Sequence, residues 1–228
     1  DYAGDSVDSA GDIDGDGHDD IIIGNSADDI AGENAGAAYV FLGSNFGAER
    51  ERHKDEADYI LTGAYEDDQA GFAVAGAGDV DGDGLDDIII GAPRNPDGDR
   101  RAGSAYIILG SRFTDERNYD LLVDADYQLM GEREEDYRGE AVMGVGDVDG
   151  DGLDDVAVGS QYDPESHSGH SDQGTVYIFL SSNLQDDPTI SLSEADQKWT
   201  GEGWSRAGSG QSFYQPISGG DVNGDGFS

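Results

Sequence analysis

Short apolar runs, each bounded by glycine, aspartate or asparagine, recur along the whole chain. None keeps a 3.6-residue periodicity long enough to predict a structural helix, and the runs have the length and β-branched content of strands. Some runs are apolar at consecutive positions, as expected for strands buried on both faces between neighbouring sheets. In the middle of the chain the predicted strands are Phe72–Ala77, Asp87–Ile90, Ser104–Leu109 and Tyr127–Met130.

One acidic segment returns several times at a nearly constant spacing. Gly11–Gly24 recurs as Gly78–Gly91 and as Gly146–Gly159, and a fourth copy begins at Gly220. A Gly-small-small-Tyr-apolar segment follows each of the first three copies in register, with tyrosines at Tyr39, Tyr106 and Tyr177. The repeat is therefore larger than the acidic segment itself and indicates a repeated structural unit.

Four predicted strands per repeat form one antiparallel sheet, and four-stranded sheets repeated radially are the blades of a β-propeller. The sequence therefore predicts an all-β chain with three full blades plus the first strand of a fourth. The chain would be a segment of a larger propeller, or it would form a larger propeller together with other chains as an oligomer. The expected repeats of this single propeller segment, residues 1–228, are 1–67, 68–135, 136–205 and, as a partial copy, 206–228.

The acidic segments carry much of an unusual charge. Fifty-one Asp and Glu against 12 Lys and Arg give a formal net charge of -39, which would repel phosphate backbones and anionic membranes. Nucleic acid is therefore not an expected partner, and bound cations or surrounding salt must offset the self-repulsion. The chain has no cysteine for a disulfide or a thiolate metal site. No apolar run approaches the ~20 residues of a membrane span, so direct membrane insertion is not expected, and no signal peptide precedes Asp1, which fits a mature or excised segment.

Each acidic segment has the pattern Asp-x-Asp-Gly-Asp-Gly-x-Asp-Asp, with carboxylates at loop positions one, three, five and nine. Because the carboxylates alternate with other residues, a tight, glycine-containing loop can turn several oxygens toward one point. Anionic oxygen ligands favour a hard cation, and calcium accepts such ligands in a flexible geometry. Position seven is expected to contribute a backbone carbonyl, through His18, Leu85 and Leu153. The predicted side-chain ligands of the three structural calcium sites are Asp12, Asp14, Asp16 and Asp20; Asp79, Asp81, Asp83 and Asp87; and Asp147, Asp149, Asp151 and Asp155.

The closest alternative to this loop is an EF-hand, which ends in a bidentate glutamate at position twelve between two helices. Here position twelve is Ile23, Ile90 or Val158, inside a predicted strand, so the EF-hand is rejected. Solvated acidic turns without an ion are a further alternative, which three copies in register disfavour. A possible partial fourth site contains Asp221, Asn223 and Asp225, without a ninth position.

The segment Gly78–Pro93 resembles the FG-GAP repeat of integrin α subunits, and the resemblance extends over nearly the whole chain. It implies a propeller of seven blades at the cell surface, with calcium in the hairpin between the first and second strands of certain blades. Adhesion and protein recognition are the functions it implies. The leading Phe of the motif is replaced by Ala3, Ala70 and Arg138, and the absence of cysteine, unlike animal integrins, favours a bacterial or other microbial relative.

Recognition is expected from the loops between the second and third strands, because they differ in sequence on a repeated scaffold. They comprise residues 25–35, 92–102 and 160–173. A protein or a glycan would be the ligand, and an extracellular or cell-surface location follows from the resemblance. Catalysis is not expected: the one candidate cluster, His167 and His170 with neighbouring acids, lies in a polar loop.

Two alternatives stay open beside adhesion. A carbohydrate-binding propeller, or the accessory propeller of a secreted enzyme, would use Trp199 and Trp204 to stack sugars, although Trp199 aligns with the strand residues Leu61 and Leu129. The charge is also compatible with a high-salt habitat. Because three blades and one strand do not close a ring, we expect either additional blades or self-association of two chains through their open ends.

Overall fold

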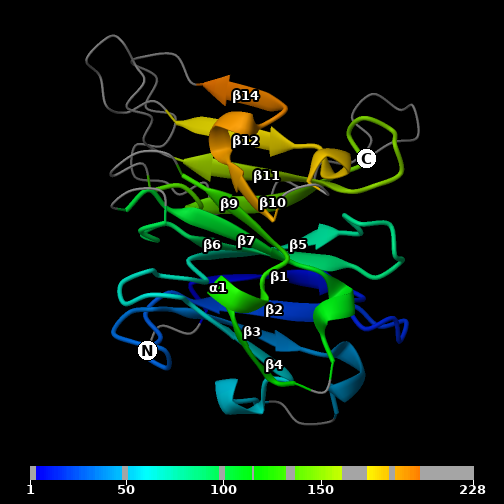
Figure 1. Cartoon of the computed structure of the whole chain (residues 1–228). Coiled ribbons are helices and arrows are strands. Elements are labelled where there is room, and N and C mark those ends of the chain that lie inside the picture. The colour runs from blue at the N-terminus through cyan, green and yellow to red at the C-terminus, as the bar shows by residue number, and fades with distance from the viewer. Residues whose placement is uncertain are drawn as a thin grey trace.

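The chain is described by a computed structural model that places residues 4–47, 51–97, 101–114, 116–131, 137–160, 174–184 and 188–200. Three β-sheets are stacked face against face in chain order (Figure 1). Their strands are short, as the glycine and aspartate punctuation of the sequence predicts.

Each sheet contains four antiparallel strands in chain order, and we call these four strands a blade. The first blade consists of β1 (Ser6–Gly11), β2 (Asp20–Asn25), β3 (Ala37–Phe41) and β4 (Tyr59–Thr62). The second consists of β5 (Ala73–Gly78), β6 (Asp87–Ala92), β7 (Ser104–Ile108) and β9 (Tyr127–Met130). The third consists of β10 (Ala141–Gly146), β11 (Asp155–Ser160), β12 (Thr175–Phe179) and β14 (Gln197–Thr200).

Two further strands link neighbouring blades. The connection between β7 and β9 contains β8 (Asn118–Asp120), which pairs in parallel with β4 of the first blade. The connection between β12 and β14 contains β13 (Thr189–Ser191), which pairs in parallel with β9 of the second blade. Each blade therefore adds a fifth strand to the outer edge of the blade before it.

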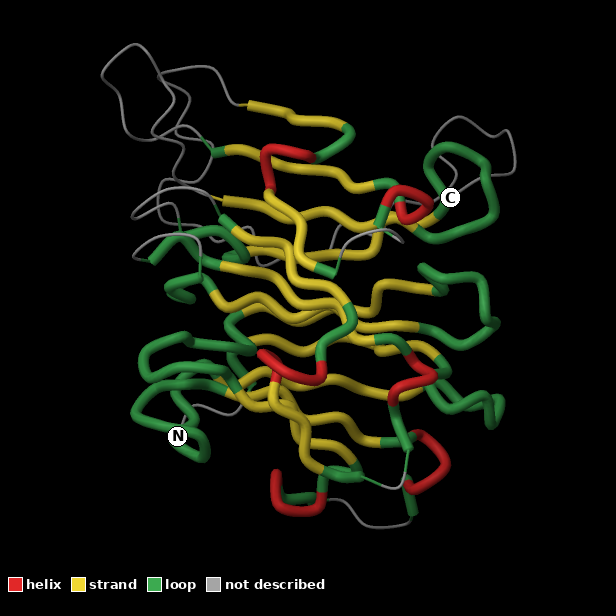
Figure 2. The backbone as a smooth tube through the Cα atoms, viewed as in Figure 1, coloured by secondary structure: helices red, strands yellow, loops and turns green. Residues whose placement is uncertain are grey.

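Helical structure in the described residues is limited to single turns at the ends of strands (Figure 2). The longest is α1, which follows β8 directly, and none is long and apolar enough to cross a membrane. The turns are α1 (Leu121–Asp124), η1 (Gly43–Asn45), η2 (Lys54–Glu56), η3 (Gly110–Arg112), η4 (Ser181–Asn183) and η5 (Leu192–Glu194).

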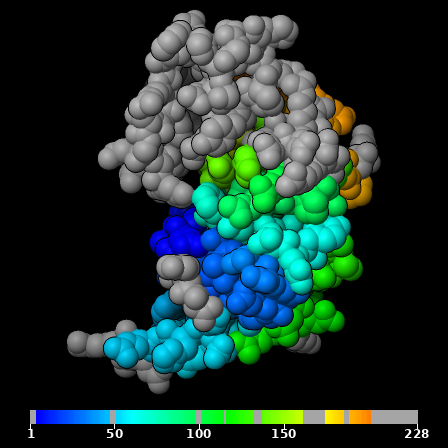
Figure 3. Space-filling model, turned by 90° about the vertical axis from the view of Figure 1, so that its left-hand side faces the viewer, coloured from blue at the N-terminus to red at the C-terminus, as the bar shows by residue number. Residues whose placement is uncertain are grey.

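The two largest hydrophobic clusters lie between neighbouring blades. On the outside, the first two blades form a continuous surface on one side of the molecule (Figure 3). Between the first and second blades, Ile22, Val40 and Leu61 pack against residues that include Ile90 and Tyr106. An equivalent cluster joins the second and third blades. The middle strands of the second blade, β6 and β7, are buried on both faces, which explains their uninterrupted apolar sequences.

The innermost strands β1, β5 and β10 lie next to one another and lead into the acidic loops. Each has a register shift at its last residues, where Gly11, Gly78 and Gly146 adopt positive φ angles of 75°, 75° and 74°. Such a bulge bends the chain at the strand end. The three acidic loops consequently leave their strands in the same way, and each contacts the next through hydrogen bonds.

The structure confirms the all-β architecture of a partial propeller with three full blades. The predicted strands of the second blade agree with β5, β6, β7 and β9 to within two residues at their ends. The parallel strands β8 and β13 are not predicted from the sequence. The first strand of the fourth blade and most of the predicted recognition loop 160–173 lie outside the described residues.

Candidate metal centre

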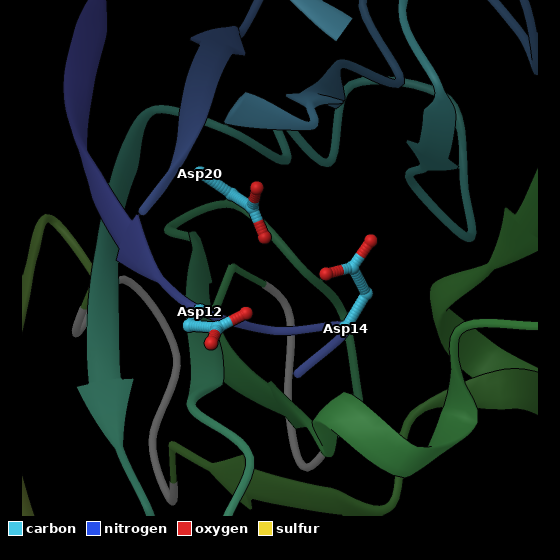
Figure 4. Close-up of side chains that lie close together, drawn as sticks. All are labelled: Asp12, Asp14 and Asp20. Atoms are coloured by element: carbon cyan, nitrogen blue, oxygen red, sulfur yellow. The ribbon is translucent and has the colours of Figure 1, made fainter. Parts of the chain in front are cut away.

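In each blade, a group of carboxylates lies close together in the loop between the first and second strands. We call the segments Asp12–Asp20, Asp79–Asp87 and Asp147–Asp155 the first, second and third acidic loops. In each loop the side chains at positions one, three and nine offer oxygen atoms within 4.8 Å of one another. Figure 4 shows this arrangement in the first loop, where the carboxyl groups of Asp12, Asp14 and Asp20 border a common space.

The carboxylate at position one is oriented by the backbone of its own loop. In the second loop, Oδ1 of Asp79 accepts hydrogen bonds from the N–H groups of Gly82 at 2.7 Å and Asp83 at 3.1 Å. Oδ2 accepts from Gly84 N–H at 3.0 Å. Gly84 has a φ angle of +91°, which a residue with a Cβ adopts only with strain. The glycines of the motif thus let the loop fold around the carboxylate at position one.

The carboxylate at position nine is buried at the start of the second strand of each blade. In the second loop, Asp87 accepts hydrogen bonds at 2.7 Å from Val80 N–H and from Gly110 N–H. Burial raises the pKa of Asp87 to about 7, with further contributions from the charges of Asp81 and Asp79. Burial likewise raises the pKa values of the equivalent residues, Asp20 and Asp155.

Position five is not part of these groups. Oδ1 of Asp16, Asp83 and Asp151 instead accepts the N–H of the residue at position seven, at 2.9 Å in all three loops. The side chain of His18, at position seven of the first loop, is exposed and lies 2.9 Å from Asp16 through Nδ1. The predicted role of the position-seven carbonyls, and of the position-five carboxylates, therefore stays a prediction.

The donor set fits a calcium ion. Oxygens that share one ion at about 2.3–2.6 Å lie no more than about 5 Å apart, and the grouped carboxylate oxygens satisfy this limit. All grouped donors are anionic oxygens, the ligand type that hard cations prefer. A buried carboxylate with raised pKa among like charges is also stabilised by a neighbouring positive charge. Bound calcium would supply that charge at each loop.

Position eight of the loops makes a contact that the sequence reasoning missed. Asp12 N–H, in the first loop, donates to Oδ2 of Asp86, in the second loop, at 2.7 Å, and Asp86 N–H donates back to the carbonyl of Asp12 at 3.2 Å. Asp154 holds Asp79 by the same two bonds, both at 3.0 Å. The second and third blades therefore each hold the position-one aspartate of the blade before them. The repetition of a second aspartate beside position nine was the available signal.

The remaining predicted site residues divide into two groups. Trp199 lies on β14 and is largely exposed. His167, His170, Trp204 and the partial fourth site at Asp221, Asn223 and Asp225 lie outside the described residues.

Comparison with known families agrees with this arrangement. A model of the FG-GAP repeat matches residues 3–41, 70–108 and 139–179, which together exceed half of the chain. The chain belongs to the FG-GAP repeat family. Each matched FG-GAP segment runs from the first strand of a blade through its acidic loop to the third strand. The predicted resemblance is therefore confirmed.

Individual relatives of this FG-GAP chain include integrins and an enzyme. Integrin alpha-PS2 of Drosophila melanogaster is 36% identical over 131 residues, 55% of this chain and 9% of the relative. Integrin alpha-5 of Xenopus laevis is 31% identical over 165 residues, 70% of this chain and 15% of the relative. Phosphatidylinositol-glycan-specific phospholipase D of Rattus norvegicus is 29% identical over 203 residues, 85% of this chain and 22% of the relative. The chain thus spans less than a quarter of each.

Proposed function

We propose that this chain is a calcium-binding, extracellular FG-GAP array that recognises a protein partner, and that calcium is structural. The observation that supports it most is the triple repetition of one carboxylate geometry within an integrin-like propeller segment. The ligands at positions one, three and nine hold the ion in each loop, and positions five and seven complete the coordination. No catalytic role is proposed.

The effect of calcium on folding follows from linkage. When free calcium is about 100 times the dissociation constant, each site adds roughly 2.7 kcal/mol to the free energy of unfolding. Three such sites approach the whole stability of a typical domain, about 5–15 kcal/mol. The loops are followed directly by buried strands such as β6, so the ions would stabilise the core as well as the loops.

Recognition is proposed for the loops between the second and third strands. In the first blade the base of this loop is held by Asp28, which accepts hydrogen bonds from Asn25 Nδ2 at 2.9 Å and Tyr39 OH at 2.6 Å. Farther along the loop, Ile30 is 59% exposed. A rigid base with an apolar tip suits a protein contact, since binding then orders few residues.

An accessory propeller of a secreted enzyme is the second candidate function. The similarity to phosphatidylinositol-glycan-specific phospholipase D, which extends over 85% of the chain, supports this alternative. A glycan would then be a fitting ligand. Binding on a glycan array that is lost with Trp204→Ala would support the accessory role, whereas capture of a surface protein that is lost with Ile30→Asp would support adhesion.

The calcium assignment is tested by thermal unfolding at one ionic strength in calcium, in excess chelator and in sodium chloride. We expect the melting temperature to fall sharply in chelator and to recover with calcium but not with sodium. Recovery by sodium alone would support adaptation to high salt instead. An unchanged melt in chelator would reject structural calcium.

A further inference from the structure

The outward face of the third blade carries apolar side chains at positions that the other blades bury. Leu61 on β4 and Leu129 on β9 are 0% exposed, whereas Trp199, at the same position on β14, is 68% exposed. Its partner across the strands is Val176, which is 40% exposed. The equivalent cross-strand partners of the two leucines are buried alanines.

The leucines are covered by the following blade. Ile60 N–H, beside Leu61, donates to the carbonyl of Arg117 at 2.7 Å, and β8 continues with Tyr119 opposite Leu61. In the next blade Gln128 N–H donates to the carbonyl of Pro188 at 2.8 Å, and β13 places Ile190 opposite Leu129.

Both added strands end in the same way. A polar residue, Asp120 or Ser191, caps a single helical turn by accepting a hydrogen bond from the backbone. The first residue of that turn is a buried leucine, Leu121 or Leu192. The covering segment is thus defined chemically: an apolar residue, a capping residue and a leucine.

We propose that the outer edge of β14, with Val176 and Trp199, is the docking surface for the same segment of a following FG-GAP blade. That segment adds a three-residue strand parallel to β14, with its apolar residue opposite Trp199. Backbone hydrogen bonds to the edge supply affinity and the apolar pair supplies specificity, as in other strand additions. The surface does not involve the acidic loops, so the proposal does not rest on calcium binding.

The residues of this chain favour a following blade over a second copy as the occupant. The covering segments of the second and third blades already lie on β4 and β9. In the first blade the two apolar positions hold Arg52 and Lys54. Arg52 stacks on Phe41 of its own blade at 5.5 Å from the ring centre, and Lys54 pairs with Asp28 at 2.7 Å. Among the residues that the structure describes, a second copy therefore has no further covering segment of this kind to donate.

The order of the chain points the same way. Beyond β14, the sequence continues into the fourth copy of the acidic motif, which begins at Gly220. The acidic motif of a further repeat thus comes next in chain order, and in the two interfaces already described the following repeat supplies the covering segment.

The test uses a synthetic peptide of residues 188–196, the covering segment of the third blade. The chain has two tryptophans, so Trp204→Phe leaves Trp199 as the only tryptophan reporter. In saturating calcium the peptide is expected to shift Trp199 emission to shorter wavelength in a saturable way. The peptide carrying Ile190→Asp should bind about tenfold more weakly or worse, because a carboxylate would be buried against the indole.

Matched variants of the protein locate the surface. Val176→Asp is expected to weaken peptide binding by about tenfold, since it places a charge in the proposed contact. Val7→Asp, at an exposed valine of β1, should leave binding unchanged. Equal loss in both variants, or equal binding of the Ile190→Asp peptide, would overturn the proposal.

Weak affinity of a free peptide is addressed by joining the peptide to the C-terminus through a flexible linker, which raises its effective concentration to the millimolar range. Absence of an emission shift in this tethered protein would also overturn the proposal. A shift without peptide that grows with protein concentration and disappears with Val176→Asp would identify a second copy as the occupant instead.

Discussion

The contact between neighbouring acidic loops is tested by Asp86→Ala. Asp86 is not one of the grouped carboxylates, yet its side chain accepts the N–H of Asp12, at position one of the preceding loop, at 2.7 Å. Removing this carboxylate leaves the partly buried N–H of Asp12 without its acceptor and should weaken the interface between the first two blades.

The magnitude follows from the charge on the acceptor. A hydrogen bond to a charged group contributes about 1.5–3 kcal/mol to stability. In a chain of this size a change of 1 kcal/mol moves the melting temperature by about 2–4 °C. Asp86→Ala is therefore expected to lower the melting temperature in calcium by about 3–12 °C.

Asp19→Ala is the matched control. Asp19 occupies position eight of the first loop, is exposed and has no blade before it among the described residues. Its replacement removes the same charge and should change stability by no more than about 0.5 kcal/mol. The assay is thermal unfolding of both variants and the parent chain in saturating calcium. Equal melting temperatures for the two variants would refute the inter-blade role of Asp86.

Three further predictions concern stability. Burial raises the pKa of Asp68 to about 6, so its contribution to stability is present at low pH and is lost as pH rises through 6; Asp68→Asn should reduce the fall in melting temperature between about pH 4 and 6, and an unchanged slope would contradict this. Lys54→Met removes the cation paired with buried Asp28 and should cost about 1–3 kcal/mol in denaturant unfolding, because Asp28 keeps its other hydrogen bonds; no loss would show that Asp28 needs no cation. At Gly11 an added Cβ would meet a neighbouring carboxylate at 2.2 Å, whereas Gly4, also at positive φ, has open space; Gly11→Ala should therefore lower the melting temperature more than Gly4→Ala, and equal effects would exclude the steric contact.

The grouping of carboxylates in the acidic loops could be predicted from the sequence because the aspartates are close together in the chain. Asp12, Asp14 and Asp20 lie within nine consecutive positions, and the glycines between them encode the turn. Strands such as β6 were predictable for a related reason, since burial on both faces leaves an uninterrupted apolar run. The family resemblance follows from the same segments.

The contacts between blades could not be predicted in this way. Asp86 reaches Asp12 across 74 positions of the chain, and nothing in its local sequence distinguishes it from exposed Asp19. The strands β8 and β13 contain three residues each, too few for an alternating pattern to show. Trp199 illustrates the consequence: its alignment with Leu61 predicts a packed residue, but its burial depends on a neighbouring blade rather than on its own strand.

The central claim is that the three acidic loops bind calcium as part of the fold. The most direct measurement is the number of calcium ions bound per chain, determined by equilibrium dialysis with metal analysis on the parent chain and on Asp14→Asn, Asp81→Asn and Asp149→Asn singly. We expect three ions for the parent and the loss of one in each variant. A parent chain that binds no calcium, or variants that bind as much as the parent, would contradict it.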